Sequence, residues 1–282
     1  MRDKRIDEHA HLDRQAAFEV GMQDQFQFVQ QAKISFNKNT QKSLPEDQKM
    51  TLLQQSKPFI NHLESWLAKL PKAKLNAVVT NPDNTAMMSV DIINGFCTVG
   101  PLASPRVQGI VKPIVKLMKA AHKKGVRHFV LTQDTHPADA VEFAYYPPHC
   151  VRGTSESESV PEYKKLPFAD EFVIVEKNSI SSLYDTGLDQ WLNAHQNVDT
   201  FIVVGDCSDL CTYQLAMHLR LRATASQRNV RVVLPENCVQ TYDTPVALAK
   251  KSGIPPHDGD LLHAVFLFNM AMNGVEVVKE IW

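Results

Sequence analysis

The sequence predicts an α/β fold in which a parallel β-sheet is covered by helices, preceded by a helical extension. From about Asn76 onward, short β-rich runs alternate with helical stretches, the order that is typical of a parallel sheet. Of the 11 glycines only Gly21 precedes Gly95, so the first part of the chain has a different character. The length of 282 residues allows one large domain or two small ones. We therefore expect a helical extension over residues 1–80 and an α/β domain over residues 81–282.

The extension is rich in Gln and Lys and carries apolar residues at helical intervals, which predicts two helices. The second helix is expected to begin near Ser43, which would cap it, with Pro45 in its first turn and Pro71 as its boundary. We expect these helices to pack on the main domain or on another copy of the chain, which would make the protein a homo-oligomer.

Six short apolar runs are the candidate strands: Ala86–Asp91, Arg127–Thr132, Glu171–Glu176, Thr200–Gly205, Val230–Leu234 and Val275–Val278. Helical patterns lie between most of them: Pro105–Lys124, Leu188–Ala194, Asp209–Ala223 and Asp258–Met272. The connection from Thr132 to Glu171 is a long loop rich in Pro, Ser and Glu. Loops of that length inside a compact domain are usually functional.

Composition excludes several classes of protein. Lys+Arg 30 against Asp+Glu 31 gives a net charge of −1, whereas a general nucleic-acid or anionic-membrane binder needs a basic excess. The charged N-terminus lacks the apolar core of a secretory signal, and the apolar stretch Ala264–Met272 is too short to span a membrane. We therefore expect a cytoplasmic protein.

Five cysteines, an odd number, favour free thiols. No Gly-rich phosphate loop follows a strand, which argues against Rossmann and P-loop folds.

Three residues with catalytic potential lie at or just beyond the ends of predicted strands: Asp91, Lys177 and Cys211. Because active sites of parallel sheets form beyond the carboxyl ends of the strands, these side chains are the first candidates. A partly desolvated Asp91 suits proton transfer, and the start of a helix at Cys211 would lower the pKa of its thiol. Each also has a structural interpretation, as a turn aspartate, a solvated lysine and an inert buried cysteine. A metal or redox pair of Cys207 and Cys211 is disfavoured, since such pairs usually have two intervening residues.

The long loop carries a second candidate site of one carboxylate and two imidazoles: Asp134, His136 and His149. This set suits a divalent Zn, Mn or Fe ion that keeps open positions for water or substrate. The alternative is structural, with both histidines satisfied by backbone carbonyls.

Five motifs, taken together and in order, resemble the isochorismatase-like cysteine hydrolase superfamily, and most closely its nicotinamidase (pyrazinamidase) branch. They are Val90–Phe96, Thr132–Pro137, Pro147–Thr154, Glu176–Ser182 and Gly205–Cys211. The similarity runs from about Thr85 to the C-terminus. It implies a three-layer α/β/α domain with a central parallel sheet of about six strands.

By this resemblance Cys211 is the nucleophile, Asp91 the general base and Lys177 the cation of a Cys-Asp-Lys triad. The triad would cleave the C–N bond of a small amide through a thioester. Backbone N–H groups of Ser208 and Cys211 would hold the oxyanion. Members of the family usually carry a cis peptide bond just before the residue that matches Ser208, which here is Cys207–Ser208.

The resemblance also suggests how a substrate is held. In nicotinamidases a metal ion holds the pyridine nitrogen while aromatic residues sandwich the ring. Asp134, His136 and His149 match the metal ligands, and Phe96 and Tyr146 match the aromatic contacts.

The expected partner is thus a small-molecule amide substrate, and neither a nucleic acid nor a membrane. Two alternatives stay open. One is another hydrolase of this fold, acting on a ureido acid, a different amide or an isochorismate-like vinyl ether; isochorismatases do not use the cysteine triad, so Cys211 argues against the last. The other is a non-catalytic binding module whose extension docks a partner, which the joint presence of Asp91, Lys177 and Cys211 argues against.

Overall fold

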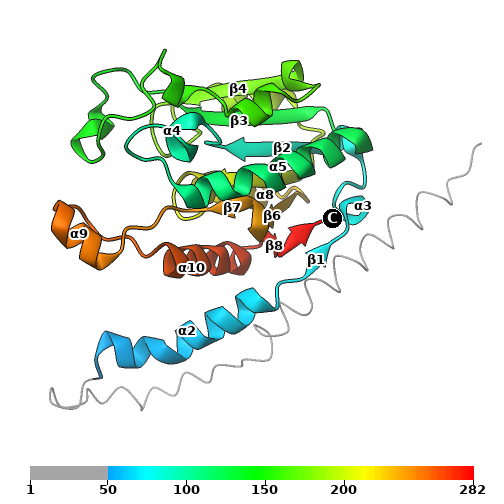
Figure 1. Cartoon of the computed structure of the whole chain (residues 1–282). Coiled ribbons are helices and arrows are strands. Elements are labelled where there is room, and N and C mark those ends of the chain that lie inside the picture. Colours follow the sequence, from blue (N-terminus) through cyan, green and yellow to red (C-terminus); the bar gives the residue numbers. More distant parts are fainter. Residues whose placement is uncertain (1–49) are drawn as a thin grey trace, which may run out of the picture. The chain divides into compact units, whose positions relative to one another are not determined.

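The computed structural model describes residues 50–282, in which a parallel sheet of seven strands forms the centre (Figure 1). Its order is β4-β3-β2-β5-β6-β8, and β7 pairs with the end of β5. The strands are β2 (Thr85–Val90), β3 (His128–Asp134), β4 (Phe172–Lys177), β5 (Thr200–Asp206), β6 (Arg231–Pro235), β7 (Val239–Gln240) and β8 (Glu276–Val278). Two further strands, β1 (Lys72–Ala73) and β9 (Glu280–Ile281), form a separate parallel pair.

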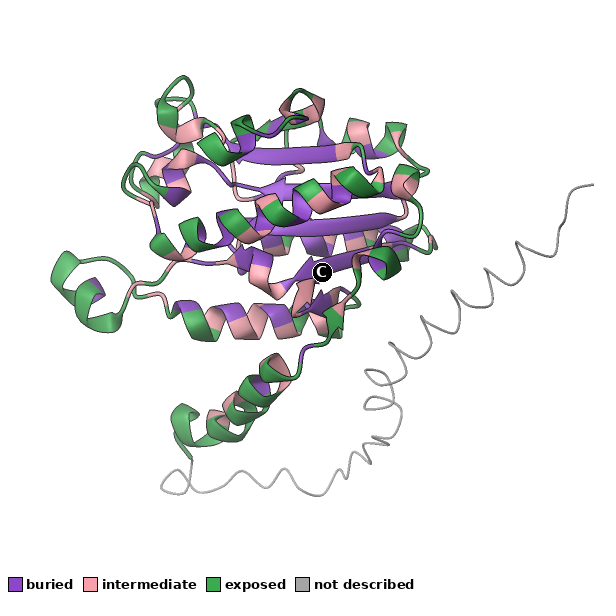
Figure 2. Cartoon of the chain, turned by 45° about the vertical axis from the view of Figure 1, so that its right-hand side comes forward, coloured by how far each residue is buried: buried purple, intermediate pink, exposed green. Residues whose placement is uncertain are grey.

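Helices cover both faces of this sheet, as the sequence predicted. From Leu75 onward the helices are α3 (Leu75–Val78), α4 (Asn94–Cys97), α5 (Pro105–Lys124), α6 (Pro161–Lys164), α7 (Leu188–Ala194), α8 (Cys211–Ala225), α9 (Val246–Ser252) and α10 (Gly259–Met272). Successive residues of β5 point to opposite sides: Val203 packs in the cluster formed with α7, α8 and α10, and Val204 in the cluster formed with α5 and α6. The inner strands β3, β2, β5 and β6 are almost entirely buried between these layers (Figure 2). The edge strand β4 leaves Val173 and Ile174 exposed. The expected three-layer α/β/α architecture is confirmed.

Helix α2 (Leu52–Ala68), together with β1 and α3, makes up the described part of the predicted extension. A reciprocal capping box starts it: the Gln54 N–H donates to Thr51 Oγ1, and the Thr51 N–H donates to Gln54 Oε1. The expected start at Ser43, and the first predicted helix, lie outside the described residues. From Ser56 the chain belongs to the compact unit that ends at Trp282, within which the Trp66 ring lies 5.2 Å from that of Phe268 on α10.

All five cysteines are free, as the odd number predicted, and all are buried. Between residues 50 and 282, no helix combines the length and the hydropathy that crossing a bilayer requires.

Candidate active site

Lys177 is the centre of a buried charged cluster at the carboxyl ends of the strands. Its Nζ lies 2.9 Å from Asp91 Oδ2, 2.5 Å from Asp134 Oδ1 and 3.5 Å from Cys211 Sγ. Asp91 is 1% exposed, Lys177 2% and Cys211 5%, so water screens these charges little. The structure thus brings together the three strand-end residues that the sequence singled out, and adds Asp134 to them.

Short backbone links hold the cluster together. Asp91 follows β2 with a positive φ of 55°, its N–H donates to the Thr132 carbonyl, and its Oδ1 accepts a hydrogen bond from the Asp134 N–H. Gly205, with φ 120°, lets β5 approach β2 closely, because a Cβ there would lie 2.0 Å from the Val90 carbonyl oxygen. This approach places the turn that carries Cys211 beside Asp91.

The surroundings set the proton positions in this cluster. Burial raises the pKa of the Cys211 thiol well above its usual range, although Lys177 opposes the shift. Burial also raises the pKa of Asp91, to about 6, against the opposing effect of Lys177. For Lys177 burial alone would lower the pKa, but Asp134, Asp91 and Cys211 outweigh burial and hold it well above the usual value. Burial thus opposes the lowering of the Cys211 pKa that a helix start would give, and the neighbouring Asp91 carboxylate is the group suited to take the thiol proton.

Two expectations about the turn before Cys211 are wrong, because the features in question lie one residue earlier in the chain than expected. The cis peptide bond is Asp206–Cys207, not Cys207–Ser208. The Ser208 N–H donates to the Gln240 carbonyl at 2.9 Å, so it is not free for an oxyanion. Among the described residues, the N–H groups of Cys207 and Cys211 have no acceptor. The predicted oxyanion role of Ser208 is therefore wrong.

Asp134, His136 and His149 converge, as predicted. Asp134 Oδ2 lies 3.6 Å from His136 Nε2 and 3.9 Å from His149 Nε2. The Nδ1 atoms face away from the cluster: that of His136 lies 2.7 Å from Asn178 Oδ1, and that of His149 lies 2.8 Å from the Pro147 carbonyl. All three side chains are buried, and His136 Nε2 has no hydrogen-bond partner within the described part of the chain.

Aromatic rings surround His149. The rings of Phe96 and Tyr146 lie 5.8 and 6.1 Å from it. Phe143 also contacts both histidines, at 5.5 Å from His136 and 5.7 Å from His149. Sequence reasoning missed Phe143, and the only available signal was its position between the two histidines.

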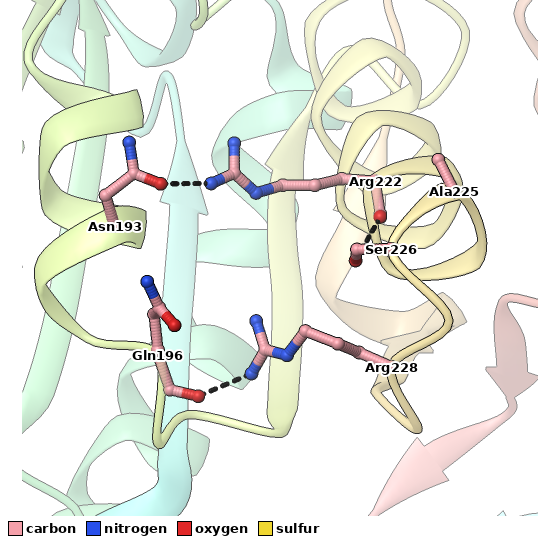
Figure 3. A pocket seen from close by; sticks show the side chains of 6 residues that line it. All are labelled: Asn193, Gln196, Arg222, Ala225, Ser226 and Arg228. Atoms are coloured by element: carbon pink, nitrogen blue, oxygen red, sulfur yellow. Dashed lines mark hydrogen bonds between the residues drawn. The ribbon is translucent and has the colours of Figure 1, made fainter.

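A separate surface pocket lies at the opposite end of the sheet, at the C-terminal ends of α7 and α8. Its two arginines extend toward the end of α7 (Figure 3): Arg222 donates to Asn193 Oδ1, and Arg228 donates to the Gln196 carbonyl. Because ligands of parallel sheets bind at the carboxyl ends of the strands, the Lys177 cluster is the better candidate for an active site.

Comparison with known proteins agrees with this geometry. The model of the isochorismatase domain matches residues 85–251. Nicotinamidase 1 of Arabidopsis thaliana is 30% identical over 233 residues, which cover 76% of this chain and 93% of that protein. Nicotinamidase of Escherichia coli K12 is 28% identical over 154 residues, 45% of this chain and 71% of that protein. The pyrazinamidase of Pyrococcus horikoshii, solved in complex with zinc, shares the fold, with a TM-score of 0.54, 23% identity and coverage of 70% of this chain and 99% of that one.

The matched residues contain the whole Lys177 cluster and the three converging metal-ligand candidates. The chain therefore belongs to the isochorismatase family, in which it is a nicotinamidase-like hydrolase.

Proposed function

We propose that the protein hydrolyses the carboxamide of nicotinamide, or of a closely similar small cyclic amide, to a carboxylic acid and ammonia. The main support is the convergence of Lys177, Asp91 and Cys211 beside three residues that suit a metal ion. The similarity to Nicotinamidase 1 over most of both chains supports the same reaction.

Asp91 and Cys211 carry the chemistry in this proposal. Their reactive atoms lie within 4.8 Å of each other, so Asp91 can take the thiol proton as Cys211 Sγ attacks the amide carbonyl. Lys177 stabilises the thiolate and the carboxylate. The free N–H groups of Cys207 and Cys211 are suited to hold the negative oxygen of the tetrahedral intermediate. Asp91 returns the proton to the leaving ammonia, and a water molecule then cleaves the thioester to release the acid.

Asp134, His136 and His149 fit a divalent metal ion. Both Nδ1 atoms are occupied by oxygen acceptors, which leaves the two Nε2 lone pairs directed toward Asp134. The unpartnered, buried Nε2 of His136 is the ligand atom that such an ion would satisfy. Zinc, manganese or iron held there would supply a Lewis acid that orients the substrate through its ring nitrogen. Phe96 and Tyr146, which lie against His149, would contact the faces of the ring.

Ammonia release from nicotinamide, pyrazinamide and a ureido acid tests the proposal, with Cys211→Ala as the blank. We expect release from the two heteroaromatic amides by the wild type, and none by Cys211→Ala. Release from the ureido acid alone would contradict the nicotinamidase-type substrate. Release from none of the three would contradict catalysis of this kind.

A further inference from the structure

His257 is a partly buried histidine that the proposed reaction does not use. Residues 242–259 form a segment that leaves the sheet after β7 and returns to the body at α10; we call this segment the flap. His257 lies at its base. Figure 1 shows α9, the helix of the flap, standing out on the side to which the β2 arrow points. That is the carboxyl end of the sheet, where the Lys177 cluster lies.

The flap is attached to the body mainly at its base. Only Ala249 and Gly259 in it are buried, and α9 is almost entirely exposed (Figure 2). The base is closed by paired backbone hydrogen bonds between Thr244 and His257, at 2.7 and 2.9 Å. Contacts at the base therefore decide where the flap lies.

His257 connects this base to the turn that carries the nucleophile. Its Nε2 lies 2.7 Å from Asp209 Oδ2, and its Nδ1 lies 3.0 Å from the Tyr242 carbonyl. Asp209, two residues before Cys211, has a side chain only 4% exposed. Its other oxygen, Oδ1, has no partner among residues 50–282. Because a buried carboxylate needs a partner, the bond to His257 is the one that fixes the orientation of Asp209.

The same histidine fixes an aromatic ring. The Tyr242 and His257 rings are stacked, with centroids 3.8 Å apart and an angle of 19° between their planes. Tyr242 follows β7 by two residues, and Gln240 of β7 pairs with Asp206 at the end of β5. The Gln240 carbonyl also accepts a hydrogen bond from the Ser208 N–H, so the chain reaches Tyr242 directly beside the turn that carries Cys211.

We propose that His257 is a positioning residue for substrate binding, which holds the Tyr242 ring as a wall of the substrate site beside the turn that carries Cys211. This inference rests on the proposed function, because that function places the substrate at Cys211. It assigns the flap a part in selecting flat, ring-shaped amides, which an aromatic wall would favour over extended ones.

Steady-state kinetics on nicotinamide test this in the full-length, metal-loaded enzyme. We expect His257→Ala to raise KM about tenfold and to change kcat by less than about threefold, because the wall contacts the substrate and not the reacting atoms. His257→Gln keeps a donor for Asp209 and is expected to restore part of the loss. Tyr242→Ala removes the wall but leaves the hydrogen bond between His257 and Asp209, so it is expected to raise KM by a similar factor. This variant decides the matter if His257→Ala does not fold.

His195 provides a matched control at the opposite end of the sheet. Its Nδ1 also bonds a backbone carbonyl, that of Trp191, and its ring also stacks on an aromatic ring, 4.2 Å from Trp191. His195→Ala is expected to leave KM unchanged. An unchanged KM in both His257→Ala and Tyr242→Ala, or an equal rise in His195→Ala, would overturn the proposal.

Alkylation of Cys211 by iodoacetamide separates this proposal from the proposed function, since it needs no amide substrate. If the wild type does not hydrolyse nicotinamide, the proposed function fails and alkylation decides the role of the wall. Faster alkylation in His257→Ala and Tyr242→Ala, but not in His195→Ala, would support a wall over the nucleophile. Wild-type rates in the first two variants would contradict it.

Discussion

Replacing Lys177 with Met removes the cation that lies between two buried carboxylates. Oxygens of Asp91 and Asp134 lie within 4.8 Å of each other, so two unit charges there repel by about 3.5 kcal/mol at an effective dielectric constant of about 20. Removal of one partner from a buried ion pair typically costs about 3–5 kcal/mol. We therefore expect Lys177→Met to lower the free energy of unfolding by about 3–4 kcal/mol and to abolish amide hydrolysis.

Urea unfolding followed by tryptophan fluorescence, with a chelator present to keep bound metal from contributing, measures this loss. Lys164 is the matched control, since its Nζ lies 2.5 Å from Glu158 while both side chains are about half exposed. Lys164→Met should cost less than about 1 kcal/mol. Asp91→Asn added to Lys177→Met should recover part of the stability, because it removes one of the two charges. Equal losses in Lys177→Met and Lys164→Met would refute the reasoning.

Three other changes test separate parts of the site. Asp91→Asn should lower kcat/KM for nicotinamide by at least about 10²-fold in an ammonia-release assay, and a near-normal rate would remove Asp91 from its role as base. His149→Ala should lower bound metal well below one ion per chain, measured by elemental analysis, while Cys211 alkylation keeps its rate; full metal content would contradict the ligand assignment. Gly205→Ala should lose at least about 4 kcal/mol in urea unfolding, because its Cβ would lie 2.0 Å from the carbonyl oxygen that ends β2. Gly109→Ala is the control, because Gly109 is exposed on α5 with open space around it, and this change should stabilise the protein by up to about 1 kcal/mol. A small loss of stability in Gly205→Ala would refute the close approach of β5 to β2.

The sequence predicted most of the fold because its local signals agree with the packing. Helix α5 has the predicted bounds, since Pro105 opens it and Gly125, with φ 110°, ends it in the left-handed conformation. The charged cluster was predictable for a topological reason: parallel strands place their carboxyl ends at one edge, so Asp91 and Lys177 had to lie near each other.

Features that depend on the backbone path were not predictable. Whether the N–H of Cys207 or that of Ser208 is free depends on which acceptor β7 offers, and β7, with two residues, is too short to give a periodic signal. The flap was missed for a similar reason, because α9 has seven residues and polar contacts hold its base. A hydrogen bond such as that between Asp209 and His257 joins distant positions and leaves no spacing pattern in a single sequence.

The most direct test of the central claim is to trap the acyl-enzyme. Wild-type enzyme mixed with nicotinamide and quenched in acid during turnover should carry one nicotinoyl group, located by peptide mass spectrometry on Cys211, and Cys211→Ala should carry none. Turnover by Cys211→Ala, or a nicotinoyl group on another residue of the wild type, would contradict the assignment of Cys211 as the nucleophile.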